Sequence, residues 1–274
     1  GIPKDFHENI CGRIKAMANL ASHVKDLPQD GKAAPPEFKG VQLRVSLFPT
    51  VYGEKIVCRI FNPEAKTFDI SMLGFDDETL VKWKEVVDKP TGLILLTGPT
   101  GSGKTTAIYA AIGFILDKQG NAISVSSVED PVEQNLDWVN QSSLNTAQGY
   151  TYPIALRSLM RQDPEIIMIG EIRDKETSEI AVNAAMTGHM VMSTLHSGTT
   201  SGTFARLINM DIEPFLLAST IIGVLGLRLL RQNCIHCSGP YTPEPFALEQ
   251  LRQHEGEEYL QSLVSQEGFY RGNG

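Results

Sequence analysis

The stretch that decides the fold reads Gly98-Pro99-Thr100-Gly101-Ser102-Gly103-Lys104-Thr105-Thr106, and it fits the pattern G-x-x-x-x-G-K-[ST]. The apolar run from Gly92 to Thr97 comes directly before it and indicates a buried strand. Apolar residues after it recur at helical spacing, namely Ala107, Ile108, Ala111, Ile112 and Ile115. A strand, a glycine loop and a helix in this order form a phosphate cradle, because the glycines let backbone N–H groups turn inward and the helix N-terminus adds the positive end of its dipole.

This cradle predicts a binding site for a nucleoside triphosphate, with residues 98–106 as the nucleotide-binding segment. We expect Lys104 to reach the β- and γ-phosphates of ATP and the Thr105 hydroxyl to bind Mg²⁺. A flexible glycine turn is the alternative, but it would require neither the strand before the loop nor the helix after it.

The composition is that of a folded chain without an excess of positive charge. Its 274 residues are enough for one large domain or two ordinary ones, and 42% of them are hydrophobic. Lys and Arg number 24 against 32 Asp and Glu, which gives a net charge of −8. This charge argues against direct nucleic-acid binding by the protein as a whole.

Two features of the sequence favour the cytoplasm. Cys11 and Cys58 stand alone while Cys234 and Cys237 form a CxxC, a pattern that suits a reducing compartment better than a disulfide framework. The longest apolar run, Phe215 to Leu227, is too short to span a bilayer. We therefore expect a cytoplasmic protein.

The first 61 residues predict a small α+β domain. Apolar residues share one helical face over residues 5–20, and residues 27–36 indicate a loop. Alternating residues predict a β-hairpin with strands at 41–47 and 56–60, joined by a loop of several residues.

After a linker at residues 62–76, helices and strands alternate, which predicts an α/β fold with a parallel sheet covered on both faces. Further helices are expected at about 77–88, 153–162 and 176–187, and further strands at 121–128, 165–170 and 189–195. In such a sheet the ligand binds at the carboxyl ends of the strands. The sequence after Pro240 is polar and poorly patterned, and residues 271–274 indicate an interrupted loop.

Two glutamates come after expected strands at this edge. Glu129 comes directly after Val128, and Glu171 comes after Gly170. The second segment resembles a Walker B strand, although Gly170 stands where an aspartate is frequent. Hydrolysis requires a carboxylate that orients or deprotonates water, and both glutamates qualify. The sequence does not separate them.

One histidine is a candidate sensor of the γ-phosphate. His196 comes after the strand at 189–195 and is surrounded by Ser and Thr residues, so we expect it to hydrogen-bond the phosphate. For His189, a satisfied polar group is an equally good interpretation.

Arginines are candidates because a planar guanidinium stabilises the charge that builds in phosphoryl transfer. Arg157 and Arg161 are one helical turn apart and are expected to share a face. Arg44 and Arg59 lie on neighbouring strands of the hairpin. The alternative for each is a solvated or salt-bridged surface residue.

Over residues 1 to about 237, these motifs and their order resemble the type II secretion and type IV pilus ATPases. The glycine loop is similar to their Walker A. Residues 27–32, 44–46 and 49–55 with Arg59 resemble their second N-terminal domain. Residues 128–133 resemble their Asp box, and residues 157–174 resemble their arginine-bearing helix and glycine-containing Walker B. Residues 187–189 and 193–196 resemble their His box.

The resemblance implies a RecA-like P-loop ATPase domain at 77–232, a PAS-like α+β domain at 1–61 and the start of a C-terminal zinc-element and helical region at 233–274. It implies a homo-hexameric ATPase at the cytoplasmic face of the inner membrane, associated with the membrane through its partners. Domain rotation would drive a membrane platform protein so that subunits join a filament. Glu129 and Glu171 would each be candidates for activating water, and Arg44 and Arg59 would approach the phosphates of a neighbouring subunit.

Cys234 and Cys237 resemble the first half of the tetracysteine zinc element found in the assembly and secretion branches of this family. Structural zinc takes four ligands, so we expect Zn²⁺ in the full-length protein and an incomplete site here, or one supported by His236. The chain begins with Gly rather than Met. We expect a fragment that lacks the first N-terminal domain and the C-terminal end of the family.

Three alternatives remain open. A pilus-retraction ATPase is opposed by the CxxC, which that branch typically lacks. A DNA-transfer ATPase is disfavoured by the net charge of −8. A nucleotide-gated adaptor without significant turnover, which is a different class of protein, is kept open by Gly170 in place of aspartate.

Overall fold

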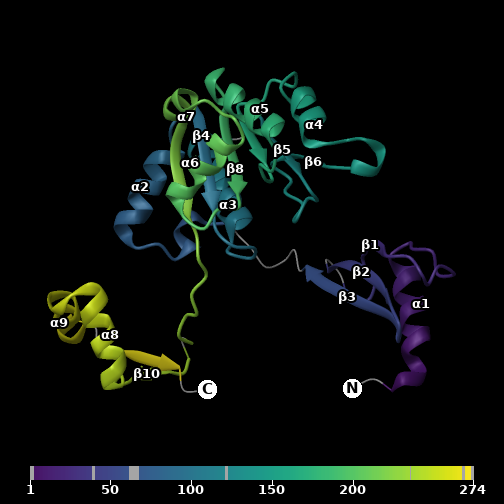
Figure 1. Cartoon of the computed structure of the whole chain (residues 1–274), viewed down its shortest axis with the longest axis horizontal. Helices are drawn as coiled ribbons and strands as arrows, with labels where there is room; N and C mark the ends of the chain where they lie inside the picture. The colour runs from purple at the N-terminus through teal and green to yellow at the C-terminus, as the bar shows by residue number, and fades with distance from the viewer. Residues whose placement is uncertain are drawn as a thin grey trace. The chain divides into compact units, whose positions relative to one another are not determined.

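The computed structural model describes residues 3–38, 41–61, 68–120, 123–234, 236–266 and 269–272 (Figure 1). The chain divides into two compact units, residues 1–227 and residues 228–274, and each is described by itself. Among the described residues, no helix is long and apolar enough to cross a membrane.

The N-terminal part of the first unit packs a helix against one face of a three-stranded antiparallel sheet. A short 3₁₀ turn, Lys4–Phe6, leads into α1 (His7–Met17), and the sheet has the order β1 (Gln29–Ala33), β2 (Gln42–Thr50) and β3 (Gly53–Phe61). Buried Ala18, Ala33, Val45 and Leu47 form the core of this part. The expected helix and the two hairpin strands are confirmed.

Two expectations for this part were wrong. Residues 27–36 contain β1 rather than only a loop, and β1 pairs with β2 from Gln29↔Leu47 to Ala33↔Leu43. Its strand character is hidden because, of its five residues, Ala33 alone is buried. The hairpin loop is also shorter than expected, since β2 and β3 remain paired up to Thr50↔Gly53. Gly53 has φ +113°, which only glycine adopts readily at such a tight turn.

The remainder of the first unit is built on a six-stranded parallel sheet, and this confirms the expected α/β fold. The strand order is β6-β5-β7-β8-β4-β9. The strands are β4 (Gly92–Thr97), β5 (Val125–Glu129), β6 (Asn140–Ser143), β7 (Ile166–Ile169), β8 (Met190–Leu195) and β9 (Ile221–Gly226). The helices are η3 (Ile70–Leu73), α2 (Asp77–Val87), α3 (Lys104–Gln119), η4 (Thr146–Gln148), α4 (Tyr152–Leu159), α5 (Lys175–Met186), α6 (Thr200–Asn209) and α7 (Pro214–Thr220).

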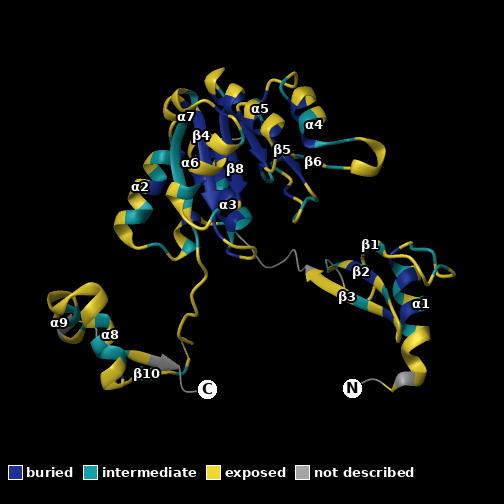
Figure 2. Ribbon diagram, viewed as in Figure 1, coloured by how far each residue is buried: buried dark blue, intermediate teal, exposed yellow. Residues whose placement is uncertain are grey.

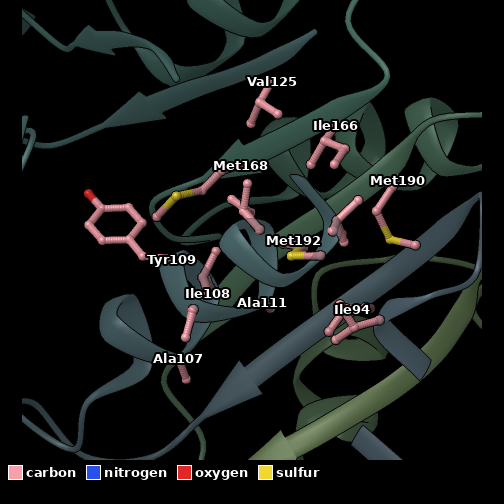
Figure 3. Close-up of a cluster of buried hydrophobic side chains, with 14 of the residues drawn as sticks. Ile94, Ala107, Ile108, Tyr109, Ala111, Val125, Ile166, Met168, Met190 and Met192 are labelled. Carbon is pink, nitrogen blue, oxygen red and sulfur yellow. The ribbon is translucent and has the colours of Figure 1, made fainter. Parts of the chain in front are cut away.

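The central strands β4, β5, β7 and β8 are buried throughout because both of their faces are covered. In β4, Ile94 and Leu96 face a cluster that includes α2 and α3, whereas Leu93 and Leu95 face a second cluster that includes α4, α5 and α7. Figure 3 shows part of the first cluster, and Figure 2 shows β4, β5 and β8 in the dark blue of buried residues. The sheet therefore fixes the loop at residues 98–103 between a buried strand and a buried helix.

Several boundaries in this sheet differ from expectation. The strand expected at 121–128 begins at Val125 and includes Glu129, while residues 121–122 lie outside the described part. The helix expected at 153–162 ends at Leu159. The polar strand β6 was not predicted, and the apolar run 215–227 contains most of α7 and all of β9.

The second unit contains a short antiparallel pair and two helices. β10 (Ser238–Pro240) pairs with β11 (Tyr270–Gly272), and α8 (Pro245–Glu255) is followed by α9 (Glu257–Gln266). The polar sequence after Pro240 indicated no individual helix or strand, although the resemblance implied a helical region there. Pro245 occupies the first turn of α8, a position that suits proline. Arg271 and Gly272 lie in β11, and residues 273–274 are outside the described part.

Candidate functional site

The glycine loop joins the buried end of β4 to the first residue of α3. Gly101 and Gly103 have φ values of +76° and +87°, so the loop takes a path that other residues adopt only with strain. α3 begins at Lys104, whose Nζ donates to the carbonyls of Gly98 and Pro99 at 2.9 Å each. The amine is thereby held inside the curve of the loop.

The loop fits a phosphate group and its metal ion. The Ser102 hydroxyl is buried and has no hydrogen-bond partner among the described residues, and a Cβ added at Gly101 would meet nothing within 4 Å. Thr105, in the first turn of α3, is half-buried and supplies the kind of oxygen that Mg²⁺ prefers. The residues present therefore suit a nucleotide with Mg²⁺.

Glu129, the last residue of β5, is a buried and fully engaged carboxylate. Its Oε2 accepts from the Tyr109 hydroxyl at 2.6 Å, and its Oε1 accepts from the Ser127 hydroxyl at 2.7 Å and from Gln141 Nε2 at 3.0 Å. Burial, followed by the charge of Glu129, raises the pKa of Tyr109, so that this hydroxyl stays a donor. This network connects β5 to α3 and β6.

Glu171 lies two residues beyond β7 and is accessible to solvent on one side. One carboxylate oxygen, Oε1, accepts from the Arg173 guanidinium, and the other, Oε2, lies 3.4 Å from His196 Nε2. Arg173 also lies 3.5 Å from an Asp130 carboxylate oxygen. The hydrogen bond to Glu171 raises the pKa of Arg173, which stays positively charged.

Gly170 has no room for the aspartate that is frequent at its position. A Cβ there would lie 2.8 Å from the Tyr152 hydroxyl and 3.3 Å from the Glu129 Cα. The Gly170 backbone is also fixed, because its N–H donates to the Val128 carbonyl and its carbonyl accepts from the Thr194 hydroxyl. Close packing at the end of β7 thus explains the glycine.

The two candidate histidines lie at opposite ends of β8. His196 comes after the carboxyl end of β8, where it meets Glu171. His189 precedes β8, and its Nδ1 lies 2.9 Å from the Ala184 carbonyl oxygen. The structure therefore brings His196 to the candidate site and places His189 at the amino end of β8, away from that site.

The candidate arginines form two separate groups. Arg157 lies 2.5 Å from a Glu176 carboxylate oxygen, and Arg161, which lies beyond the end of α4, donates to the Arg157 carbonyl. The two arginines do not share a helical face as expected, because the helix ends at Leu159. Arg44 and Arg59 are exposed and directly opposite each other on β2 and β3.

The four cysteines, all within the described part, are free. Hydrogen bonds from the backbone of His236 and Cys237 lower the pKa of the exposed Cys234 thiol. Among the described residues, no group of three or more His, Cys, Asp and Glu could hold a metal ion, so His236 does not complete a site with the CxxC.

Four residues of the site had no individual role in the sequence-based prediction. Tyr109, Gln141, Tyr152 and Arg173 reach Glu129, Gly170 or Glu171 from different elements. Arg173 lies two residues after Glu171 in a turn and could have been found from that spacing. The other three meet the site through tertiary packing.

The parallel sheet and the glycine loop between β4 and α3 define a domain with the RecA-like fold. The chain belongs to the family described as Type II/IV secretion system protein, which matches residues 3–270. Among curated relatives, it is 45% identical over 240 residues to the type IV pilus assembly ATPase PilB of Myxococcus xanthus, covering 87% of this chain and 42% of that protein. It is 40% identical over 243 residues to the type II secretion system protein E of Pectobacterium carotovorum, covering 88% of this chain and 48% of that protein.

Solved structures agree with this assignment. The pilus retraction motor PilT with bound ADP has a TM-score of 0.61 and 26% identity, over 88% of this chain and 71% of that one. The Yersinia pseudotuberculosis ATPase DotB has a TM-score of 0.62 at 23% identity, over 93% of this chain and 73% of that one, and supports the fold. The chain spans about half the length of the curated relatives it matches.

Proposed function

We propose that this chain binds and hydrolyses ATP and that the hydrolysis powers type IV pilus assembly or type II secretion. The observation that supports this most strongly is the Glu171 carboxylate beside His196, at the same sheet edge as the glycine loop. The relatives named as pilus assembly and secretion proteins supply the process.

Three side chains of the loop have roles in nucleotide binding. The Lys104 amine exchanges its two carbonyl partners for the β- and γ-phosphates, and the Ser102 hydroxyl gains a partner that the described residues do not provide. Thr105 would hold Mg²⁺ through its hydroxyl. A bound Mg²⁺ would neutralise the charge that develops on the phosphates.

We assign the activation of water to Glu171 rather than to Glu129. A general base needs a free oxygen lone pair within reach of water. Glu171 has solvent access, whereas Glu129 is 2% exposed and accepts three hydrogen bonds from protein groups. Glu129 instead fixes the position of β5 against α3, and His196 senses the γ-phosphate.

A ring of six subunits would complete the site. Lys32, Arg44 and Arg59 form one exposed row across the N-terminal sheet, and none of the three is ion-paired within the described part. Like charges directly opposite each other destabilise a sheet, so this row is better explained by an anionic ligand than by the fold. We propose that it approaches the phosphates bound by a neighbouring subunit. A role for Arg157 and Arg161 stays a prediction.

Domains at 1–61 and 77–232, joined by the linker at 62–76, would move against each other as ATP is turned over. The ring would work at the cytoplasmic face of the inner membrane through a platform protein. Residues 233–274 would begin a C-terminal region in which Cys234 and Cys237 contribute to a zinc site of the full-length protein.

The proposal is tested by the steady-state release of phosphate from ATP and by the binding of a fluorescent nucleotide. Lys104→Ala should abolish both. The matched control is Lys118→Ala at the far end of α3, where the side chain forms an exposed ion pair with Asp88. Turnover by Lys104→Ala at the wild-type rate would contradict the proposal, and nucleotide binding without turnover by the wild-type protein would favour the nucleotide-gated adaptor.

A further inference from the structure

Tyr152, the first residue of α4, places its hydroxyl in a buried position at the carboxyl edge of the sheet. The residue is 6% exposed and packs within the second hydrophobic cluster. Its hydroxyl oxygen is 2.8 Å from where a Cβ of Gly170 would be. Its oxygen approaches the Glu171 backbone N–H, but its proton has no acceptor among the described residues. A buried hydroxyl proton without an acceptor is unfavourable, so this hydroxyl calls for one.

The surroundings make this hydroxyl a donor. Burial, followed by the charges of Glu171 and Asp130, raises the pKa of Tyr152, whereas the Glu171 backbone N–H lowers it. The hydroxyl therefore keeps its proton and lies close to the carboxyl groups of Glu171 and Asp130. A donor near a carboxylate, without a direct bond, is the arrangement that a bridging water satisfies.

The hydroxyl also occupies the space of a missing side chain. Residue 170 stands where P-loop ATPases often carry an aspartate, and here it is glycine. The Tyr152 oxygen fills the volume in which that side chain would begin. The Tyr152 hydroxyl, which belongs to α4, thus supplies a polar group at the end of β7 in place of the aspartate.

We propose that Tyr152 is a positioning residue for Glu171: its hydroxyl donates to a water molecule that also hydrogen-bonds the Glu171 carboxylate and fixes that carboxylate for hydrolysis. This inference rests on the proposed ATP hydrolysis. The existing contacts of the carboxylate, to Arg173 and His196, are with side chains that are about half exposed, and solvent weakens their hold. Tyr152 provides a fixed contact from the buried side.

Tyr152→Phe removes the oxygen and keeps the ring in the core. We expect kcat for ATP hydrolysis to fall about 10-fold, with KM and the affinity for a fluorescent nucleotide unchanged, because misplaced catalytic groups lower the rate of the chemical step. The matched control is Tyr150→Phe, whose hydroxyl is bonded to Ser142 at 2.8 Å, and it should keep the wild-type kcat.

A double-mutant cycle separates positioning from packing. In the Glu171→Gln background, Tyr152→Phe should change the single-turnover rate less than twofold, because the group that it positions has been disabled. The proposal is overturned if Tyr152→Phe keeps the wild-type kcat, or if it lowers the rate equally in both backgrounds. A higher Mg²⁺ requirement with unchanged kcat would overturn it in favour of metal anchoring.

An experimental structure that resolves waters tests the arrangement without turnover. We expect a water within about 3.2 Å of both the Tyr152 oxygen and the Glu171 carboxylate, and a dry hydroxyl would overturn the proposal. The two proposals fail separately. If Lys104→Ala loses turnover while Tyr152→Phe keeps the wild-type kcat, the role of Tyr152 alone is contradicted. If Lys104→Ala keeps the wild-type rate, the proposed function is contradicted, and the bridging water is still tested by the structure.

Discussion

Replacing Glu171 by Gln should stop ATP turnover in a protein that still folds and binds nucleotide. Gln has nearly the same size but cannot accept a proton, and loss of a general base costs about 10²- to 10⁴-fold in rate. The ionic contacts of Glu171 are with Arg173 and His196, whose side chains are 57% and 47% exposed. Solvent screens such pairs, so we expect the free energy of unfolding to change by less than about 1 kcal/mol.

The same substitution at Glu129 should have a different result. Its carboxylate is buried and accepts from Tyr109, Ser127 and Gln141. In Glu129→Gln, one carboxylate oxygen becomes an NH₂ group that faces a donor, and each hydrogen bond to a charged group contributes about 1.5–3 kcal/mol. We expect a loss of about 2–4 kcal/mol in the free energy of unfolding, with turnover lost in proportion to the unfolded or displaced fraction.

Both variants are compared by urea unfolding, phosphate release and fluorescent-nucleotide binding. The expected pattern is a stable, nucleotide-binding and inactive Glu171→Gln beside a destabilised Glu129→Gln. The reasoning is refuted if Glu171→Gln keeps its rate while Glu129→Gln is inactive at unchanged stability, because Glu129 would then be the base.

Two further predictions concern the N-terminal part. Lys15→Met should lower the free energy of unfolding by about 3–5 kcal/mol, because Lys15 Nζ forms a buried ion pair at 2.6 Å with a Glu54 oxygen and donates to the Val24 carbonyl. The control in urea unfolding is Lys25→Met, which removes an exposed ion pair with Glu8. Equal effects of the two substitutions would contradict the burial argument. Arg44→Ala chains mixed with Lys104→Ala chains should recover part of the ATPase rate if Arg44 acts on a neighbouring subunit; a mixture as inactive as its components would remove support for that role.

The sequence predicted the parts of the fold in which burial leaves a pattern. β4, β7 and the first half of β8 are largely apolar because both faces of the sheet are covered, and the glycine loop identifies the helix that comes after β4. β1 and β6 were not predicted from the sequence because nearly all of their side chains are polar or partly exposed. β9 was hidden in an apolar run, where a buried strand and a buried helix look alike.

For the candidate site, the sequence predicted which residues lie at the ends of strands, but it did not predict the side chains that contact them. Glu129 and Glu171 were both expected at strand ends, and the difference between them comes from Tyr109 and Gln141, which reach Glu129 from α3 and β6. The glycine at residue 170 was noticed as a departure, but its cause, the Tyr152 hydroxyl from α4, depends on tertiary packing. Such contacts between distant elements leave no spacing to detect.

The central claim, a ring-forming ATPase, is tested most directly by measuring ATP turnover per chain against protein concentration, with sedimentation in the presence and absence of a non-hydrolysable ATP analogue. The account predicts a species of six chains, favoured by the analogue, and a rate per chain that rises with concentration until the ring is formed. A monomer whose rate per chain does not depend on concentration would contradict it.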